Sequence, residues 1–212
     1  YYKSVFSPID VIEEYTRPAR LVKNEEIVTK SAMTEIEQLD FPDIGILDAF
    51  NSDGLRSLLN LPIPNMVEKT LRFPGHIQKV IALRDEGKFS EENIQSTAAS
   101  LIVDWAPKAL DKDQTVMRLE FYGKVAGENY GIRYDLHDKY DRENNITSMA
   151  RTTGYTCSAA LQLLLSNQFS RSGVFNLEDL GNSPQFVSSI LEYLKNRGIS
   201  LTENPIDINQ EV

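Results

Sequence analysis

The chain has 212 residues, of which 41% are hydrophobic and 25% charged, the proportions of an ordinary globular protein. Its formal net charge of −9 argues against nucleic acid or an anionic membrane surface as a partner, and no apolar run or signal-peptide pattern indicates a membrane span or secretion. The single cysteine, Cys157, excludes an internal disulfide and indicates a reducing cytoplasm, and with only two histidines the chain cannot assemble a zinc-type metal site.

The N-terminal part of the chain predicts short helices and strands. Ser7 is expected to cap a helix that has Pro8 in its first turn. Residues 23–26 are expected to turn a tight hairpin. Asp53 is expected to cap a second short helix, which the proline-rich residues 61–64 end. The candidate strands here are residues 19–22, 27–29, 36–41 and 46–50.

Residues 67–73 and 74–86 predict a strand that runs directly into a helix, because β-branched and aromatic residues give way to apolar side chains at helical spacing. Arg72 then lies where free backbone N–H groups and the helix dipole favour an anion. Its guanidinium suits a carboxylate, and Gly75 lets a ligand approach the backbone closely. The competing interpretation is that Arg72 pairs with one of the chain's many acids and that Gly75 only makes the turn.

His76 follows in the first turn of that helix, where the positive end of the dipole disfavours imidazolium and keeps the ring neutral. Three roles stay open for it: relaying a proton from a substrate amine, donating a hydrogen bond to a carboxylate, or packing as a helix-cap residue. The second histidine, His137, lies in phase with polar residues of a strand and is expected to face solvent or an interface.

The clearest pattern in the chain is a long hairpin. Apolar and polar residues alternate from residue 116 to residue 140, which predicts two antiparallel strands with one buried face, turning near residues 127–129. A helix over residues 94–110 precedes this hairpin, and Pro107 is expected to end or bend it.

Residues 145–167 predict a long helix with a stripe of small side chains, which either packs tightly on the sheet or receives a close neighbour. The stripe consists of Ala150, Thr153, Gly154, Cys157 and Ala160. A last helix is expected to begin at Ser183 and end at Gly198. The acidic tail, residues 203–211, is expected to be a solvated end.

Four runs of residues resemble, in order and spacing, those of the saccharopine dehydrogenase and lysine 6-dehydrogenase family. They are FSP at residues 6–8, FNSDGLR at residues 50–56, EKTLRFPGH at residues 68–76 and TSMARTTGY at residues 147–155. The resemblance covers most of the chain. It implies the second domain of that family, which binds substrate and forms the dimer.

The fold that this resemblance implies is an α+β domain over residues 1–212, with a mixed, largely antiparallel sheet covered by helices, like the C-terminal domain of glyceraldehyde-3-phosphate dehydrogenase. The chain contains no Gly-x-Gly-x-x-Gly after a strand and opens on Tyr1. We therefore expect an upstream Rossmann domain to bind NAD or NADP, and residues 174–212 to pack toward it, with a weak seam near Gly173. Alone, the chain is expected to be inactive.

The resemblance also implies site residues. The expected substrate-binding residues are Arg72, Gly75, His76, Phe6, Ser7 and Asn51, with His76 also as the catalytic candidate; Thr153 and Gly154 are expected to contact the nicotinamide end of the cofactor, and no metal is expected. Phe6-Ser7 stands where saccharopine reductases usually carry Trp-Ser, so the indole N–H is lost. Ser7 is also explained as a helix cap. Asp53 and Gly54 are further candidates for orienting a substrate amine.

The implied activity is oxidation or reduction at the CH–NH group of an amino acid, of saccharopine or lysine type, in a homodimeric NAD(P)-dependent oxidoreductase. The departures at Phe6 and His76 favour a lysine-type or other amino-acid substrate over saccharopine. Two alternatives stay open: a non-catalytic assembly module of the same fold, and a polyamine-forming enzyme similar to homospermidine or carboxynorspermidine synthases. Neither nucleic acid nor a membrane is expected as a partner.

Overall fold

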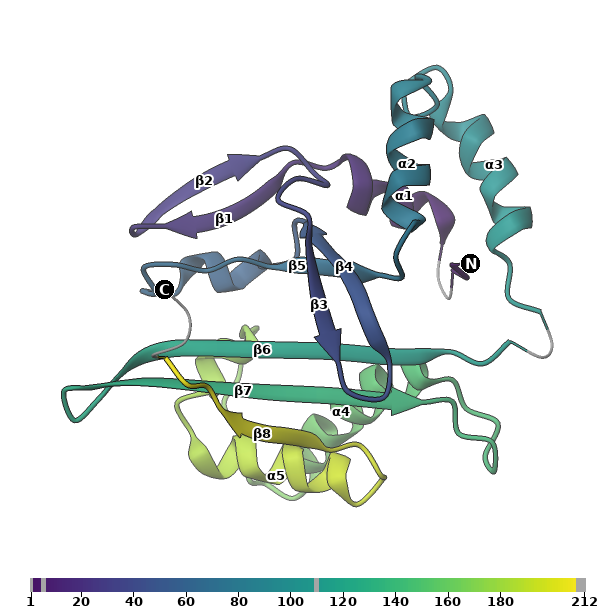
Figure 1. The fold of residues 1–212 in the computed structure, drawn as a ribbon. Helices are drawn as coiled ribbons and strands as arrows, with labels where there is room; N and C mark the ends of the chain where they lie inside the picture. The colour runs from purple at the N-terminus through teal and green to yellow at the C-terminus, as the bar shows by residue number, and fades with distance from the viewer. Residues whose placement is uncertain (1, 5–6, 109–110, 209–212) are drawn as a thin grey trace. The chain divides into compact units, whose positions relative to one another are not determined.

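The computed structural model describes residues 2–4, 7–108 and 111–208 of the chain (Figure 1). They form two compact units, residues 1–109 and residues 110–212, and each is described by itself.

Three helices of the first unit surround its hydrophobic core. They are α1 (Pro8–Thr16), α2 (His76–Asp85) and α3 (Ile94–Trp105). The core consists of Val11, Tyr15, Met33, Phe50, Ile77, Val80 and Trp105. The helix predicted over residues 74–86 begins only at His76, because Pro74 and Gly75 form a turn in which Gly75 has a φ of +88°. Helix α3 ends just before Pro107, as predicted.

The strands of the first unit make two antiparallel sheets. Strands β1 (Ala19–Lys23) and β2 (Glu26–Lys30) form the predicted tight hairpin. Strands β3 (Glu37–Phe41), β4 (Gly45–Asn51) and β5 (Lys69–Arg72) form the other sheet in that order.

The register of β4 and β5 decides which side chains share a face. Arg72 pairs with Asp48 and Thr70 pairs with Phe50. Because side chains alternate along a strand, these four residues lie on one face of the sheet, whereas Asn51 lies on the other.

The predicted cap at Asp53 is wrong. The short helix that follows is a 3-10 helix, η1 (Arg56–Asn60), and within the described chain no side chain caps it. The buried Asp53 carboxylate instead accepts hydrogen bonds from the backbone N–H, Nε and Nη2 of Arg20 at 2.8–3.1 Å. The two-pronged, charge-assisted contact with Arg20 uses both oxygens of this carboxylate, so it is not free to cap the helix.

The second unit is built on the predicted long hairpin, but the prediction of one buried face is wrong over much of its first strand, where Leu119, Phe121 and Val125 are exposed. Strands β6 (Gln114–Val125) and β7 (Glu128–Lys139) pair along their whole length and turn at Ala126-Gly127. Both turn residues have positive φ, which matches the twist of a two-residue hairpin.

A third strand of this unit, β8 (Leu201–Pro205), pairs antiparallel with β7. The acidic tail from residue 203 therefore begins inside a strand, although Glu203 and Pro205 are exposed there, as predicted for a solvated end. The segment alternates too little for a sequence pattern to mark it, and its pairing comes from the free edge of β7.

Helices α4 (Ser148–Leu165) and α5 (Pro184–Lys195) lie along one face of the β6–β8 sheet, with a short 3-10 helix, η2 (Leu177–Leu180), between them in sequence (Figure 1). The core of this unit consists of Leu136, Leu194 and Ile199 with Met117, Tyr155, Ile190 and Leu201 packed against it. Ser183 caps α5 by accepting a hydrogen bond from the Phe186 N–H, as predicted.

The fold is therefore α+β, as predicted. Every strand pairing among the described residues is antiparallel, and the strands are distributed over three sheets rather than one. Of the helices in the described parts of the chain, none has the length and apolarity needed to cross a membrane.

Candidate functional site

Arg72, the last residue of β5, is the centre of a buried polar cluster in the first unit. Its Nε donates to the hydroxyl oxygen of Tyr15 at 2.9 Å, its Nη1 to the carbonyl of Leu71 at 2.9 Å, and its Nη2 to Oε2 of Glu14 at 2.6 Å. The guanidinium also lies 4.6 Å from the centre of the Tyr2 ring. Only 14% of the Arg72 side chain is exposed.

Three separate elements supply this cluster. Helix α1 carries Glu14 and Tyr15 near its C-terminal end, β5 ends at Arg72, and α2 begins at His76. The phenol ring of Tyr15 is 1% exposed and packs against Phe50 of β4 with 5.7 Å between ring centres. We call Glu14, Tyr15, Arg72 and His76 the Arg72 cluster.

His76 joins the cluster through Tyr15, whose hydroxyl oxygen lies 2.9 Å from Nε2 of the histidine. The imidazole also packs among the rings of Tyr2, Tyr15 and Trp105. Burial, and after it the positive charge of Arg72, lowers the pKa of His76 to about 4. The ring is therefore neutral at pH 7, as predicted, although burial rather than the helix dipole is the main cause.

The pKa values of the two acidic groups in the cluster, Glu14 and Tyr15, are raised rather than lowered. Burial raises the pKa of the Glu14 carboxyl, more than the neighbouring Arg72 charge lowers it, and the charge of Glu68 raises it further. Burial likewise raises the pKa of the Tyr15 phenol, so that Tyr15 keeps its proton.

A second set of polar contacts continues along the same face of β4 and β5. The Ser52 hydroxyl lies 2.6 Å from Oγ1 of Thr70 and 2.8 Å from Oε2 of Glu68, and the backbone N–H of Gly54 donates to the same carboxylate oxygen at 3.0 Å. A Cβ on Gly54 would lie 2.5 Å from Glu68 Cδ. The FNSDGLR and EKTLRFPGH runs therefore meet here.

Three members of this region were not predicted from the sequence: Glu14, Tyr15 and Glu68. Glu68 stands four residues before Arg72 in the run EKTLR, so strand alternation indicates that it shares a face with Arg72. No pattern in the sequence points to Glu14 or Tyr15, since they come from a helix more than fifty residues away.

The structure brings two of the predicted substrate-binding residues together, Arg72 and His76. Gly75 stands between them in the chain at the N-cap of α2, where its positive φ explains the glycine, and no described atom would lie within 4 Å of a Cβ added there. Ser7 is the N-cap of α1, but within the described chain its side chain makes no capping hydrogen bond, so that part of the prediction is wrong. Phe6 lies outside the described residues.

Asn51 is buried on the face of β4 opposite to that of Arg72. Its Nδ2 donates to Oε2 of Glu35 at 2.9 Å and to Oγ1 of Thr34 at 3.3 Å. Its Oδ1 has no partner among the described residues. The register of the strand therefore separates the Asn51 side chain from the Arg72 cluster.

Thr153 and Gly154 belong to the second unit, on the exposed side of α4. No described atom lies within 4 Å of a Cβ placed on Gly154, and Cys157 is exposed as well. The interpretation of this stripe as tight packing on the sheet is wrong, because Ala150, Thr153, Gly154 and Cys157 are exposed. The predicted contact of Thr153 and Gly154 with the cofactor stays a prediction.

The TSMARTTGY run has a clear structural role at its start. Arg151 donates to both carboxylate oxygens of Asp138 at 3.2–3.3 Å, to Asp141 at 2.8 Å and to the carbonyl of Arg197 at 2.9 Å. The fully buried Ser148 hydroxyl donates to Asp138 at 2.7 Å. These bonds join α4 to β7 and to the chain after α5.

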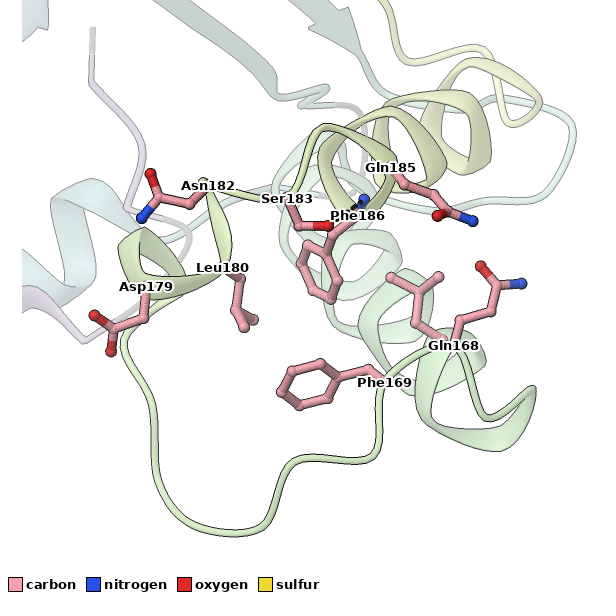
Figure 2. Close-up of a pocket in the computed structure, with 9 residues that line it drawn as sticks. Gln168, Phe169, Asp179, Leu180, Asn182, Ser183, Gln185 and Phe186 are labelled. Atoms are coloured by element: carbon pink, nitrogen blue, oxygen red, sulfur yellow. Dashed lines mark hydrogen bonds between the residues drawn. The ribbon is translucent and has the colours of Figure 1, made fainter.

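A concavity of about 280 Å³ lies in the second unit, where α4 ends and α5 begins. Figure 2 shows Phe169, Leu180 and Phe186 turned toward a common space, with the amides of Gln168 and Gln185 to one side. None of the predicted site residues lines it. Among the described residues, no group of three or more His, Cys, Asp or Glu side chains could hold a metal ion.

Comparison with known proteins agrees with this fold. The family model of the saccharopine dehydrogenase C-terminal domain matches residues 1–199, which includes most of both units. The chain belongs to the saccharopine dehydrogenase family, in which it corresponds to the C-terminal domain.

One solved structure with a similar fold is the apo histidine-tagged saccharopine dehydrogenase (L-Glu forming) from Saccharomyces cerevisiae, with a TM-score of 0.74 and 18% sequence identity. The match covers 97% of this chain and 62% of that one. The chain therefore spans about 62% of the length of that enzyme, and the likeness concerns the fold.

Proposed function

We propose that this chain is the substrate-binding and dimerisation domain of an NAD(P)-dependent oxidoreductase that acts on the CH–NH group of an amino acid of saccharopine or lysine type. The observation that carries the proposal is the Arg72 guanidinium, which three acceptors hold in one orientation beside the N-terminus of α2. An oriented and mostly buried guanidinium binds a carboxylate at a low entropic cost.

The hydrogen-bond inventory of Arg72 supports a role in binding. A guanidinium has five N–H donors, and the three bonds above use one on Nε, one on Nη1 and one on Nη2. One N–H on each terminal nitrogen has no acceptor among the described residues. Two such donors fit the two oxygens of a carboxylate.

Glu14 supports the same assignment, because its carboxylate suits the amine of the substrate. An amino acid carries an ammonium close to its carboxylate, and the Glu14 carboxyl lies beside the guanidinium with Glu68 near enough to influence its pKa. In the proposal Glu14 orients the amine while Arg72 holds the acid group. A bound nicotinamide would take up or supply the hydride, and this chain would hold the amino acid in place for that step.

The decisive experiment uses the parent protein, with its upstream segment, in an assay of amine-linked NAD(P) reduction. Arg72→Ala should lower kcat/KM by about 10- to 100-fold, the effect of losing a charge-assisted hydrogen bond worth roughly 1.5–3 kcal/mol. The matched control is Arg84→Ala, since Arg84 pairs with its neighbour Asp85 on the exposed surface of α2.

Two further measurements complete this test. A thermal unfolding curve of Arg72→Ala separates loss of binding from loss of the fold, and the 212-residue chain alone should show no turnover. Unchanged KM and turnover in Arg72→Ala would contradict the proposed role.

The homodimer and the cytoplasmic setting are also parts of the proposal. The β6–β7 hairpin carries exposed apolar side chains at Leu119, Phe121 and Val125, which suit burial against a second copy. The exposed free thiol of Cys157 suits a reducing compartment. Sedimentation of the parent protein over a range of concentrations tests the dimer.

A non-catalytic assembly module is the second candidate, and one observation favours it. Arg72 is paired with Glu14 and Tyr15, as an arginine with a purely structural role would be. This candidate predicts that Arg72→Ala lowers stability and leaves any activity of the parent protein unchanged. It also predicts that the upstream segment lacks a Gly-x-Gly-x-x-Gly run after a strand.

A further inference from the structure

The hydroxyl group of Tyr15 makes two short contacts in the Arg72 cluster. Its oxygen lies 2.9 Å from Nε of Arg72 and 2.9 Å from Nε2 of His76. Arginine Nε can only donate, so the Tyr15 oxygen accepts that hydrogen bond. The one hydroxyl proton of Tyr15 must then find an acceptor of its own, and Nε2 of His76 is the remaining partner among the described residues.

The opposite arrangement leaves a buried proton without a partner. If Nε2 of His76 carried a hydrogen, Arg72 and His76 would both donate to the Tyr15 oxygen, and the hydroxyl hydrogen of Tyr15 would have no acceptor among the described residues. Tyr15 is 1% exposed, so water does not reach its hydroxyl to relieve this. An unsatisfied buried donor is costly, whereas an unprotonated Nε2 lets each of the two bonds have one donor and one acceptor.

The remaining ring nitrogen of His76 then carries the proton. The ring is neutral at pH 7, because burial and the Arg72 charge lower the pKa of His76 to about 4. A neutral imidazole has one N–H, and with Nε2 as acceptor that N–H is on Nδ1. Nδ1 has no partner among the described residues, and the residue is half-buried rather than enclosed.

We propose that Tyr15 is a positioning residue that holds His76 as the Nδ1–H tautomer, so that His76 offers a hydrogen-bond donor, not a proton acceptor, to a ligand bound at Arg72. The tautomer follows from the contacts of Tyr15 alone, whereas the presence of a ligand rests on the proposed function. With the two spare N–H groups of Arg72, the cluster presents donors, which selects an anionic oxygen group such as a carboxylate. His76 therefore orients the acid group and does not abstract a proton through Nε2.

The tautomer can be measured directly in the 212-residue chain by ¹⁵N NMR of the imidazole nitrogens at pH 7. The chain has only two histidines, so His137→Gln assigns the His76 signals by elimination. The expected spectrum has a protonated Nδ1 and an unprotonated, hydrogen-bonded Nε2 for His76. A protonated Nε2, or an average of the two tautomers, would overturn the proposal.

Tyr15→Phe tests the role of the hydroxyl while keeping the ring in the core. The variant should shift His76 to the Nε2–H form or to a mixture, and an unchanged Nδ1–H tautomer would refute the positioning role. Tyr134→Phe is the matched control, since Tyr134 lies on β7 in the other unit and should leave His76 unchanged. Backbone amide spectra of both variants establish that they are folded.

A titration of the parent protein with L-lysine separates this proposal from the proposed function. Binding of L-lysine should move the Nδ1–H proton signal of His76 in the wild type. The affinity for L-lysine should fall several-fold in Tyr15→Phe. If L-lysine and L-glutamate both fail to bind, the proposed function is contradicted at this site, while the tautomer measurement still decides the role of Tyr15.

Discussion

Glu14 and Arg72 form an ion pair in which neither side chain is more than a third exposed, at 32% and 14%. Such a pair depends on both partners, because removing one leaves the other charge in a poorly solvated place. Glu14→Ala should therefore lower the free energy of unfolding of the chain by about 2 kcal/mol, measured by urea denaturation. Glu13→Ala is the control and should change it by less than about 0.5 kcal/mol, since Glu13 pairs with Arg17 at the surface. Equal effects would show that the pair is effectively solvated.

His76 makes the stability of the chain depend on pH. Its pKa is lowered to about 4 in the folded protein, against about 6.5 for an ordinary histidine, so between these values the unfolded chain binds more protons. Stability should therefore fall as the pH falls from about 6.5 to 4. The shift would correspond to about 3 kcal/mol if fully buried, and partial exposure reduces it to roughly 1–2 kcal/mol.

The comparison that isolates this effect is wild type against His76→Gln, by thermal or urea unfolding at several pH values. The wild type should lose stability relative to the variant below pH 6.5 and hold a constant difference above pH 7. A difference that does not vary with pH would mean that the imidazole is solvated in the folded chain.

At the scale of single residues, the sequence indicated Arg72, Gly75 and His76, because a strand that runs into a helix is a local pattern. The local sequence pattern did not identify the hydrogen-bonding partners of Arg72. Glu14 and Tyr15 are held against Arg72 by the packing of α1 on the core. Contacts between residues so far apart in the sequence produce no periodic pattern from which they could be predicted. The Asp53 carboxylate shows the same limit, since its partner Arg20 comes from a different strand.

At the scale of elements, periodicity located the β6–β7 hairpin nearly to the residue, since one face of both strands alternates with the other. It did not locate β8, whose pairing is supplied by the edge of β7. It placed the small residues of α4 on one face but could not say which way that face points. Tertiary packing turned Thr153, Gly154 and Cys157 outward.

The outward orientation of Gly154 has a testable consequence. A glycine inside a helix costs roughly 0.5–1 kcal/mol relative to alanine, and at Gly154 no described atom would meet the added methyl group. Gly154→Ala should therefore raise the unfolding midpoint of the 212-residue chain. Gly54→Ala is the contrasting variant and should lower it, because the new Cβ displaces Glu68. A destabilised Gly154→Ala chain would show that this helix face is packed after all.

Gly154→Ala also tests the predicted cofactor contact in the parent protein. If the α4 stripe lies against the nicotinamide end of NAD(P), Gly154→Ala should raise the KM for the cofactor while stabilising the domain. An unchanged KM for NAD(P) would count against the predicted roles of Thr153 and Gly154.

At the scale of the whole molecule, the chain folds into two compact units, and the family match spans both. The core of each unit is its own: Tyr15, Phe50 and Ile77 in the first, Leu136, Leu194 and Ile199 in the second. The C-terminal residues complete the second unit through β8 and α5. The predicted packing of residues 174–212 toward a nucleotide-binding domain stays a prediction for the parent protein.

The family, the α+β class, the long hairpin and the position of Arg72 at the end of a strand were all evident in the amino-acid sequence, because each depends on residues that are close along the chain. The three-dimensional fold was needed to learn that Arg72 pairs with Glu14 and Tyr15, that Asn51 lies on the opposite face of the sheet, and that the stripe on α4 is exposed. These features depend on which surfaces the hydrophobic core buries against one another. That choice is made by the packing of the whole chain and is not encoded in any local repeat.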